Sequence, residues 1–256
     1  NAGVMRPIDV VVPENSLLSA KFPAPTGGYT ETILRMIDVV FSAFAKVAPT
    51  RVVANAYGTI NALSIAGKRS NGQPWVMFSF YGGGHGGSVE TDGLNHGNAP
   101  ISTATIPPME ILEAAYPVMF RTWGLRPDSA GHGAHRGGVG AVYEIEVLEA
   151  NGAEAFLFGE RGRFAPKGIA EGADGAMNVF TYEQEEGWET PPLASKIRGI
   201  KLLQGQAVRL ETPGGGGYGP SAERSAAAIA QDVHRGLVSE EAADQVYGTT
   251  WREVTS

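Results

Sequence analysis

Two groups of side chains in glycine-rich loops have the types and spacing needed for chemistry. Asp92 and His96, with Asn98 after them, follow the glycine-rich run 82–87. An Asp–His pair can act as a general base with its orienting group, and the glycines before it would make a floor for a bound group. The alternative is a loop whose Asx side chains bond their own backbone, since no serine or threonine nucleophile can be assigned to the pair. We predict Asp92 and His96 as candidate catalytic residues.

The second group lies in the loop 131–140, where Arg136 stands between glycines. An arginine held in this way can clamp a carboxylate or phosphate with two hydrogen bonds. In the alternative interpretation its guanidinium bonds the carbonyls of its own turn. His132 and His135 of the same loop are three residues apart, but a metal site needs three or four ligands and only Asp128 lies close by. We predict Arg136 as a third candidate catalytic residue and assign no metal ligand in this chain.

The composition excludes several classes of protein. The chain has 256 residues, a net charge of −7, 43% hydrophobic residues and no cysteine. The acidic balance argues against a nucleic-acid partner, and the missing cysteines exclude disulfides, a thiolate nucleophile and Cys-ligated metals. No apolar run reaches the ~18 residues that cross a bilayer, and no signal peptide is visible. We therefore expect a cytoplasmic protein that binds neither nucleic acid nor a membrane.

The hydrophobic pattern predicts an α+β fold. The clearest element is a helix from Thr30 that ends before Pro49, because its apolar residues recur on one face. The run 74–81 is apolar at nearly every position, which indicates a strand buried on both faces. We expect a β-rich core, a long helix near the N-terminus and a two-helix C-terminal tail, divided into 1–220 and 221–256. The other expected elements are strands at 4–12, 118–125, 139–148, 153–158 and 207–210, and helices at 109–115, 221–235 and 239–247.

The run from Thr212 to Gly219 contains four consecutive glycines. A phosphate-binding P-loop would continue with a lysine and a hydroxyl residue, whereas Tyr218, Gly219 and Pro220 stand here. A phosphate cradle and a tight structural turn are the two alternatives. The second is favoured, with a neighbouring backbone passing too close to the glycines for any side chain.

Several short motifs follow one another along the chain: Asn1-x-Gly-x-x-Arg-Pro7, Gly58-Thr-x-Asn61, Gly82-Gly-Gly-x-Gly86, Asp92-Gly93, Arg136-Gly-Gly-x-Gly140, Glu160-Arg161, Thr212–Gly219 and Val238-Ser with Tyr247-Gly248. In this order they resemble the hydantoinase B/5-oxoprolinase family, the HyuB-type subunit, to which acetone and acetophenone carboxylase subunits are related. The spacing from Asp92 to His96 is shorter than in the family, and Gln206 replaces a usual aspartate.

The resemblance implies part of an ATP-dependent amidohydrolase for hydantoins, 5-oxoproline or related cyclic amides. Region 1–220 would be the C-terminal part of a HyuB-type subunit. A HyuA-type partner would bind ATP and Mg²⁺ and phosphorylate the substrate oxygen. The family's divalent metal, zinc or manganese, is expected in an N-terminal half carried outside this chain, which would be a second partner. The alternatives are a subunit of an acetone- or acetophenone-type carboxylase, acting on a ketone, and a non-catalytic structural subunit.

Overall fold

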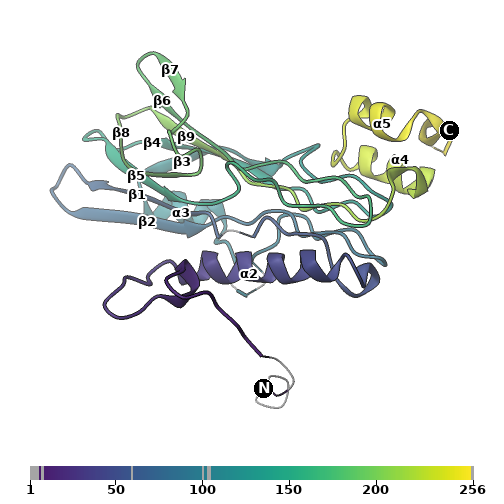
Figure 1. Ribbon diagram of the computed structural model, residues 1–256. Helices are drawn as coiled ribbons and strands as arrows, with labels where there is room; N and C mark the ends of the chain where they lie inside the picture. The colour runs from purple at the N-terminus through teal and green to yellow at the C-terminus, as the bar shows by residue number, and fades with distance from the viewer. Residues whose placement is uncertain (1–5, 7–8, 59, 100, 103–104, 255–256) are drawn as a thin grey trace.

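The protein is described from a computed structural model, which covers residues 6, 9–58, 60–99, 101–102 and 105–254 (Figure 1). Its strands form two antiparallel sheets, with strand orders β2-β1-β5-β8 and β3-β4-β9-β6-β7. Together with four α-helices in this part of the chain, the sheets confirm the predicted α+β fold with a β-rich core. The strands are β1 (Ala62–Lys68), β2 (Pro74–Phe80), β3 (Val118–Leu125), β4 (Ala141–Val147), β5 (Ala153–Phe158), β6 (Val179–Gln184), β7 (Gly187–Glu189), β8 (Lys196–Leu202) and β9 (Ala207–Glu211).

The longest helix and the two tail helices lie outside the sheets. Figure 1 shows the longest, α2, along one side of the molecule, and α4 and α5 together at the end away from the β7 hairpin. The long helix and the two-helix tail are therefore confirmed. Among the described residues no helix has both the length and the apolar character needed to span a bilayer. The helices are α2 (Tyr29–Phe44), α3 (Met109–Ala115), α4 (Ala226–His234) and α5 (Glu240–Tyr247), and the short 3-10 turns are η1 (Leu17–Ser19), η2 (Pro49–Arg51), η3 (Ser221–Glu223) and η4 (Thr250–Val254).

The main core lies between the two sheets and is built largely from alternate residues of their strands, β7 excepted. In β2, Trp75 and Met77 are buried, whereas Val76 and Phe78 are 55% and 53% exposed. The prediction of a strand at 74–81 is therefore confirmed, but its burial on both faces is wrong. Antiparallel sheets cover one face and leave the other open, so an apolar run alone does not show that both faces are packed.

Several predicted boundaries differ from those in the structure. Residues 9–12 are not a strand, and most of the rest of the predicted strand at 4–12 lies outside the described residues. The helix predicted at 221–235 begins as η3, and α4 starts after Ser225, whose Oγ accepts a hydrogen bond from Ala228 N at 3.3 Å. The strands β1, β6, β7 and β8 were not predicted, because small and charged residues interrupt their apolar pattern.

The tail built from α4, α5 and η4 has a small hydrophobic core of its own, formed by Ile229, Ala230, Ala243 and Trp251. Polar contacts of the tail with the body include Asp128, whose Oδ1 accepts from Ser239 N at 2.7 Å. The division at residue 220 stays a prediction.

The glycine run 214–217 lies at the centre of a bundle of extended segments. The N–H of Gly215 donates to Gly138 O at 2.9 Å, that of Gly216 to Asn55 O at 2.9 Å, and that of Gly217 to Ala173 O at 2.8 Å. Three successive donors thus reach three different segments, as in a threefold extended helix without internal hydrogen bonds. The prediction of a tight turn is wrong, and the N–H groups that a phosphate cradle would need are already used.

The glycines are required because backbone surrounds the run on every side. A Cβ atom added to any of the four would overlap a backbone carbonyl oxygen of a neighbouring segment. This confirms the expectation of close backbone approach. The oxygens that the Cβ atoms of Gly214 to Gly217 would meet belong, in order, to Ser129, His85, Lys167 and His132.

The bundle also fixes the candidate site. The backbone of His85 packs against Gly215, and so does Gly137, which follows Arg136.

Candidate functional site

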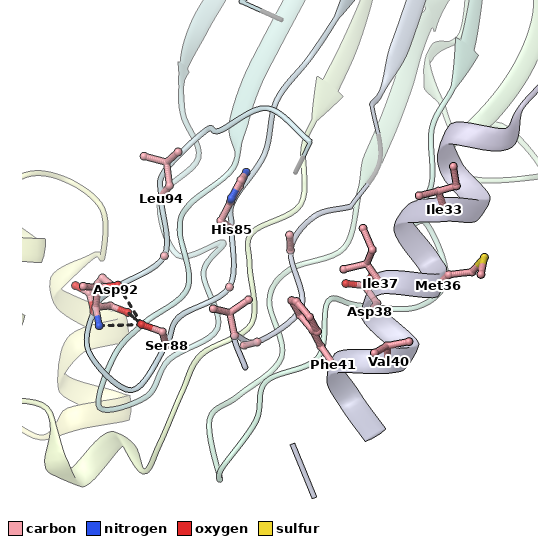
Figure 2. A pocket seen from close by; sticks show the side chains of 16 residues that line it. Ile33, Met36, Ile37, Asp38, Val40, Phe41, His85, Ser88, Asp92 and Leu94 are labelled. Atoms are coloured by element: carbon pink, nitrogen blue, oxygen red, sulfur yellow. Dashed lines mark hydrogen bonds between the residues drawn. The ribbon is translucent and has the colours of Figure 1, made fainter. Parts of the chain in front are cut away.

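A groove of about 820 Å³ separates α2 from the glycine bundle and is lined by both apolar and polar side chains. In Figure 2, Ile37 and Phe41 point from α2 toward the opposite wall, which carries His85 and Asp92. The α2 wall is therefore mostly apolar, apart from Asp38, and the other wall presents a ring nitrogen, hydroxyls and a carboxylate. A mostly apolar cleft with a few convergent polar groups is typical of a small-molecule site.

His85 lies on the polar wall and is oriented by the chain itself. Its ring Nε2 lies 2.6 Å from Asn98 O, a carbonyl that can only accept, so Nε2 carries the proton. In the neutral ring this leaves Nδ1 as an acceptor. Further along the wall, Ser88 Oγ and Thr91 Oγ1 lie 3.1 Å apart and close a short turn before Asp92.

Asp92 is held by an ionic cluster at the end of the groove next to the helical tail (Figure 2). Arg224 binds both of its oxygens, at 2.8 Å and 2.7 Å, and Arg136 N donates to Oδ1 at 3.0 Å. Burial alone would raise the pKa of this carboxyl, but the hydrogen bonds and charges of Arg224 and Arg136 outweigh it and hold the pKa below its usual value. Asp92 is therefore an ionised anchor at neutral pH, which makes it a poor proton acceptor.

Arg136 belongs to the same cluster and is 5% exposed. Its Nε donates to Asp232 Oδ1 at 2.9 Å, and its Nη1 donates to Asn95 Oδ1 at 3.0 Å and to Gly137 O at 2.8 Å. The carbonyl of the following residue is thus one partner, as the alternative interpretation of this loop expected. Its guanidinium is already shared by these groups in the described structure, so clamping a ligand would require the cluster to open.

His96 lies apart from Asp92, and the structure describes no hydrogen bond between the two. The His96 ring Nε2 forms a hydrogen bond with the Tyr143 hydroxyl, and the backbone N–H of His96 donates to Val139 O at 2.8 Å. Burial lowers the pKa of His96 and raises that of Tyr143, so a neutral ring accepts from a protonated phenol. The predicted base-and-orienter pair is not assembled in this structure. The catalytic roles of Asp92, His96 and Arg136 stay predictions.

The other histidine pair bonds to the protein. His132 Nδ1 lies 2.6 Å from Ser221 Oγ, and His135 Nδ1 lies 3.8 Å from Asp92 Oδ1. Within the described ranges, no group of three or more histidine, cysteine, aspartate or glutamate side chains is arranged to hold a metal ion. The described part of the chain thus offers no donor set that fits the metal implied by the resemblance.

The state of His96 predicts a pH dependence of stability. The pKa of His96 is lowered in the folded protein, so the unfolded chain binds its proton first as pH falls below about 6.5. The contribution of His96 to the free energy of unfolding should therefore be complete above that pH. It should fall as the pH drops toward the pKa of His96 in the folded protein, with a slope of up to about 1.4 kcal/mol per pH unit. Urea denaturation between about pH 7 and pH 5 measures it, and the His96→Gln variant should show a shallower slope.

A control is needed because burial also lowers the pKa of His132, which adds a dependence of the same sign. The double variant with His132→Gln should therefore be flatter than either single variant. An identical slope in His96→Gln and the unsubstituted chain would contradict a buried neutral His96.

The structure adds functional candidates that sequence reasoning missed. Arg224 and Asp232 complete the cluster around Asp92, with Arg224 Nη2 at 2.6 Å from Asp232 Oδ2. Both lie in the predicted tail, more than 130 residues after Asp92, so no local spacing could have connected them. His85 was visible as a histidine inside a glycine run, but its place in the groove depends on α2.

Comparison with known proteins shows to which family the chain belongs. Residues 1–221 match the sequence profile of the Hydantoinase B/oxoprolinase family. The chain belongs to this family. The resemblance recognised from the ordered motifs is thereby confirmed.

Two relatives illustrate what this hydantoinase B-type chain is similar to. The putative B-type subunit of the D-/L-hydantoinase of Pseudomonas sp. (strain NS671) is 30% identical over 250 residues, which are 98% of this chain and 42% of that protein. The beta subunit of the caprolactamase of Pseudomonas jessenii is 31% identical over 264 residues, 97% of this chain and 44% of that protein. The hydantoinase B-type chain therefore spans less than half the length of these relatives.

Solved structures agree with the family. The crystal structure of ATP-dependent caprolactamase from Pseudomonas jessenii matches with a TM-score of 0.80 and 26% identity, over 93% of this chain and 42% of that one. A nucleotide-free acetone carboxylase matches with a TM-score of 0.65 over 80% of this chain and 31% of that chain. At 21% identity the second likeness concerns the hydantoinase B fold alone.

Proposed function

We propose that this chain forms part of the B-type subunit of an ATP-dependent amidohydrolase that acts on hydantoins, 5-oxoproline or related cyclic amides. The observation that carries the proposal is the match to ATP-dependent caprolactamase, which extends over 93% of the chain at a TM-score of 0.80. Family membership and a putative hydantoinase among the relatives support a hydrolase-type role.

The proposal assigns ATP and Mg²⁺ to a HyuA-type partner subunit. An amide is a poor electrophile until its oxygen is phosphorylated, after which water can attack the carbon and phosphate can leave. The glycine run 214–217 does not supply a phosphate site here, because Gly215, Gly216 and Gly217 donate their N–H groups to the chain's own carbonyls. The divalent metal, zinc or manganese, would be held by the polypeptide that carries the remaining family length, and no step is assigned to it in this chain.

Within this chain the groove is the place best suited to a cyclic amide. The α2 wall, with Ile37 and Phe41, matches ring methylene groups, and the polar wall offers His85 to the amide. Such a ligand needs mostly apolar contact with a few polar groups to fix its orientation.

Two alternatives have observations in their favour. An acetone-type carboxylase subunit is supported by the fold likeness to acetone carboxylase, at a TM-score of 0.65. A non-catalytic structural subunit is supported by the ionic cluster. In it Asp92 pairs with Arg224 and Arg136 pairs with Asp232, so both candidates are bound to residues of the tail.

The expected result is release of ADP that depends on a hydantoin, 5-oxoproline or a lactam when the chain is assembled with its HyuA-type partner and the rest of the B-type subunit. A coupled ADP assay with and without bicarbonate measures it. Turnover that requires bicarbonate and a ketone would assign the carboxylase reaction instead, and no release with any of the amides would reject the proposal.

Single alanine variants of Asp92, His96 and Arg136 in the assembled complex test the predicted catalytic residues. A loss of turnover in a variant that still assembles and keeps its melting temperature would support a role in the reaction. Unchanged turnover in all three would favour the structural subunit.

A further inference from the structure

The helix α2 is turned so that its charged side faces the protein. Arg35 donates to the carbonyl of Gly58, and Asp38 Oδ2 lies 2.6 Å from Arg161 Nη2. Glu31, one turn earlier, is 6% exposed. These three positions, Glu31, Arg35 and Asp38, recur at the helical period, so they make one stripe that packs inward.

The opposite side of α2 is apolar and exposed. We call Ile33, Met36, Val40 and Phe44 the outer stripe; they are 38%, 41%, 49% and 54% exposed. At 100° per residue, this stripe is centred about 180° from the charged one. Surface helices usually place their apolar stripe toward the core. In α2 Leu34 is the one apolar side chain that is fully buried, and the outer stripe is left uncovered.

Further uncovered apolar side chains lie along the groove and in the segment before α2. Ile33, Met36 and Val40 also form the rim of the groove (Figure 2). Before α2, the segment 9–28 exposes large apolar side chains, among them Leu17 at 83% and Phe22 at 99%. Exposed large apolar side chains in this number are typical of an interface.

We propose that the outer stripe of α2 is the permanent docking surface for the polypeptide that supplies the rest of the hydantoinase B-type subunit. The chain spans 42% of the hydantoinase relative, so more than half of the family's length has to pack somewhere. The stripe carries no charge, which fits a permanent apolar contact better than a transient, charge-steered one. Docked there, that polypeptide would also close the open side of the groove.

The inference rests on the proposed function only in assuming that the rest of the B-type subunit assembles with this chain. Its test therefore measures assembly and not turnover. The chain has no cysteine, and Met36→Cys therefore introduces its single thiol. In the chain alone this thiol should react readily with a maleimide. In the complex with the polypeptide that carries the remaining family length, labelling should slow at least about tenfold, because interface cores exclude water. Glu241→Cys, exposed in α5, is the matched control and should react equally in both states.

A second pair of variants separates docking from folding. Val40→Glu should leave the melting temperature of the chain alone unchanged, since Val40 is 49% exposed. It should weaken the complex about 100-fold, because docking would bury an unpaired carboxylate. Val254→Glu, in η4 and 51% exposed, should affect neither quantity.

Three outcomes would overturn the proposal. They are undiminished labelling of Met36→Cys in the complex, unchanged assembly of Val40→Glu, and protection of Met36→Cys in the chain alone as its concentration is raised, which would assign the face to a second copy. If Met36→Cys is protected but no amide supports ADP release, the proposed function fails and the docking surface stands. If turnover occurs while Met36→Cys stays reactive, the docking surface alone fails.

Discussion

Replacing Gly215 by alanine is expected to abolish folding of this chain. The added Cβ would overlap the carbonyl oxygen of His85 and approach Gly86 N at 2.8 Å. Both obstacles are backbone, and rotation of a side chain cannot relieve them. Gly215 also donates to Gly138 O at 2.9 Å and its carbonyl accepts from Gly131 N at 2.8 Å. A shift that makes room would therefore break hydrogen bonds to both ends of the loop 131–140.

The size of the effect follows from the number of segments that meet at this point. A single substitution rarely costs more than about 4 kcal/mol, but here several backbone segments would have to separate. We therefore expect a loss above about 4 kcal/mol, which is comparable to the whole stability of a domain at the lower end of the usual range of about 5–15 kcal/mol. The Gly215→Ala protein should therefore be recovered as insoluble or unfolded material, as judged by circular dichroism and the absence of a cooperative melting transition.

Gly124→Ala is the matched control. Gly124 lies in β3, and no heavy atom lies within 4 Å of the Cβ that alanine would add. This variant should change the free energy of unfolding by no more than about 0.5 kcal/mol. A Gly215→Ala protein that melts like the Gly124→Ala protein would contradict the tightly packed bundle.

Replacing Arg224 by alanine should destabilise the protein strongly and free its helical tail. Arg224 contacts Asp92 at 2.7 Å and Asp232 at 2.6 Å, and Asp232 is 4% exposed. Removing one partner from a buried ionic cluster leaves a charge without compensation, which costs about 3–5 kcal/mol. The lower end of that range is expected, because Arg136 still contacts Asp232 and Asp92 is partly exposed to water.

Urea denaturation measures the loss of stability, and hydrogen exchange locates it. Amides of α4 and α5 should exchange faster in Arg224→Ala, since Arg224 and Asp232 join the tail to the groove segment at Asp92. Arg252→Ala removes an arginine that also contacts two carboxylates, those of Glu240 and Asp244, but on the exposed surface. Exposed pairs contribute little, so this control should melt like the unsubstituted chain. Equal melting of both variants would show that the cluster does not hold the tail.

Local sequence pattern was sufficient for much of the fold. The short helix at 109–115 and the strand at 153–158 were predicted at the observed boundaries, because each has a compact pattern between clear breakers. Helices α4 and α5 end at glycines with positive φ, Gly236 at 67° and Gly248 at 78°, and these ends also follow from local backbone preference. The strand β8 was missed, because Arg198, Gly199 and Lys201 interrupt its apolar alternation and its pairing with β5 holds it in the sheet.

The candidate site was predicted only in part. The residues Asp92 and Arg136 do lie together, and both belong to loops that the glycine pattern had already marked. Their partners Arg224 and Asp232 come from the far end of the chain. Whether a carboxylate is an anchor or a base depends on the charges around it, and those charges are set by the tertiary structure.

The sequence by itself determined the family, the α+β class and the places where glycine is required, because ordered motifs and local periodicity are properties of the chain. Only the tertiary structure decided what the glycines and the charges do. It placed the run 214–217 at the centre of a backbone bundle, turned the charged side of α2 inward, and used Arg136 and Asp92 to hold the tail. The physical reason is that close backbone packing, helix orientation and pKa depend on neighbours distant in sequence, which no local pattern contains.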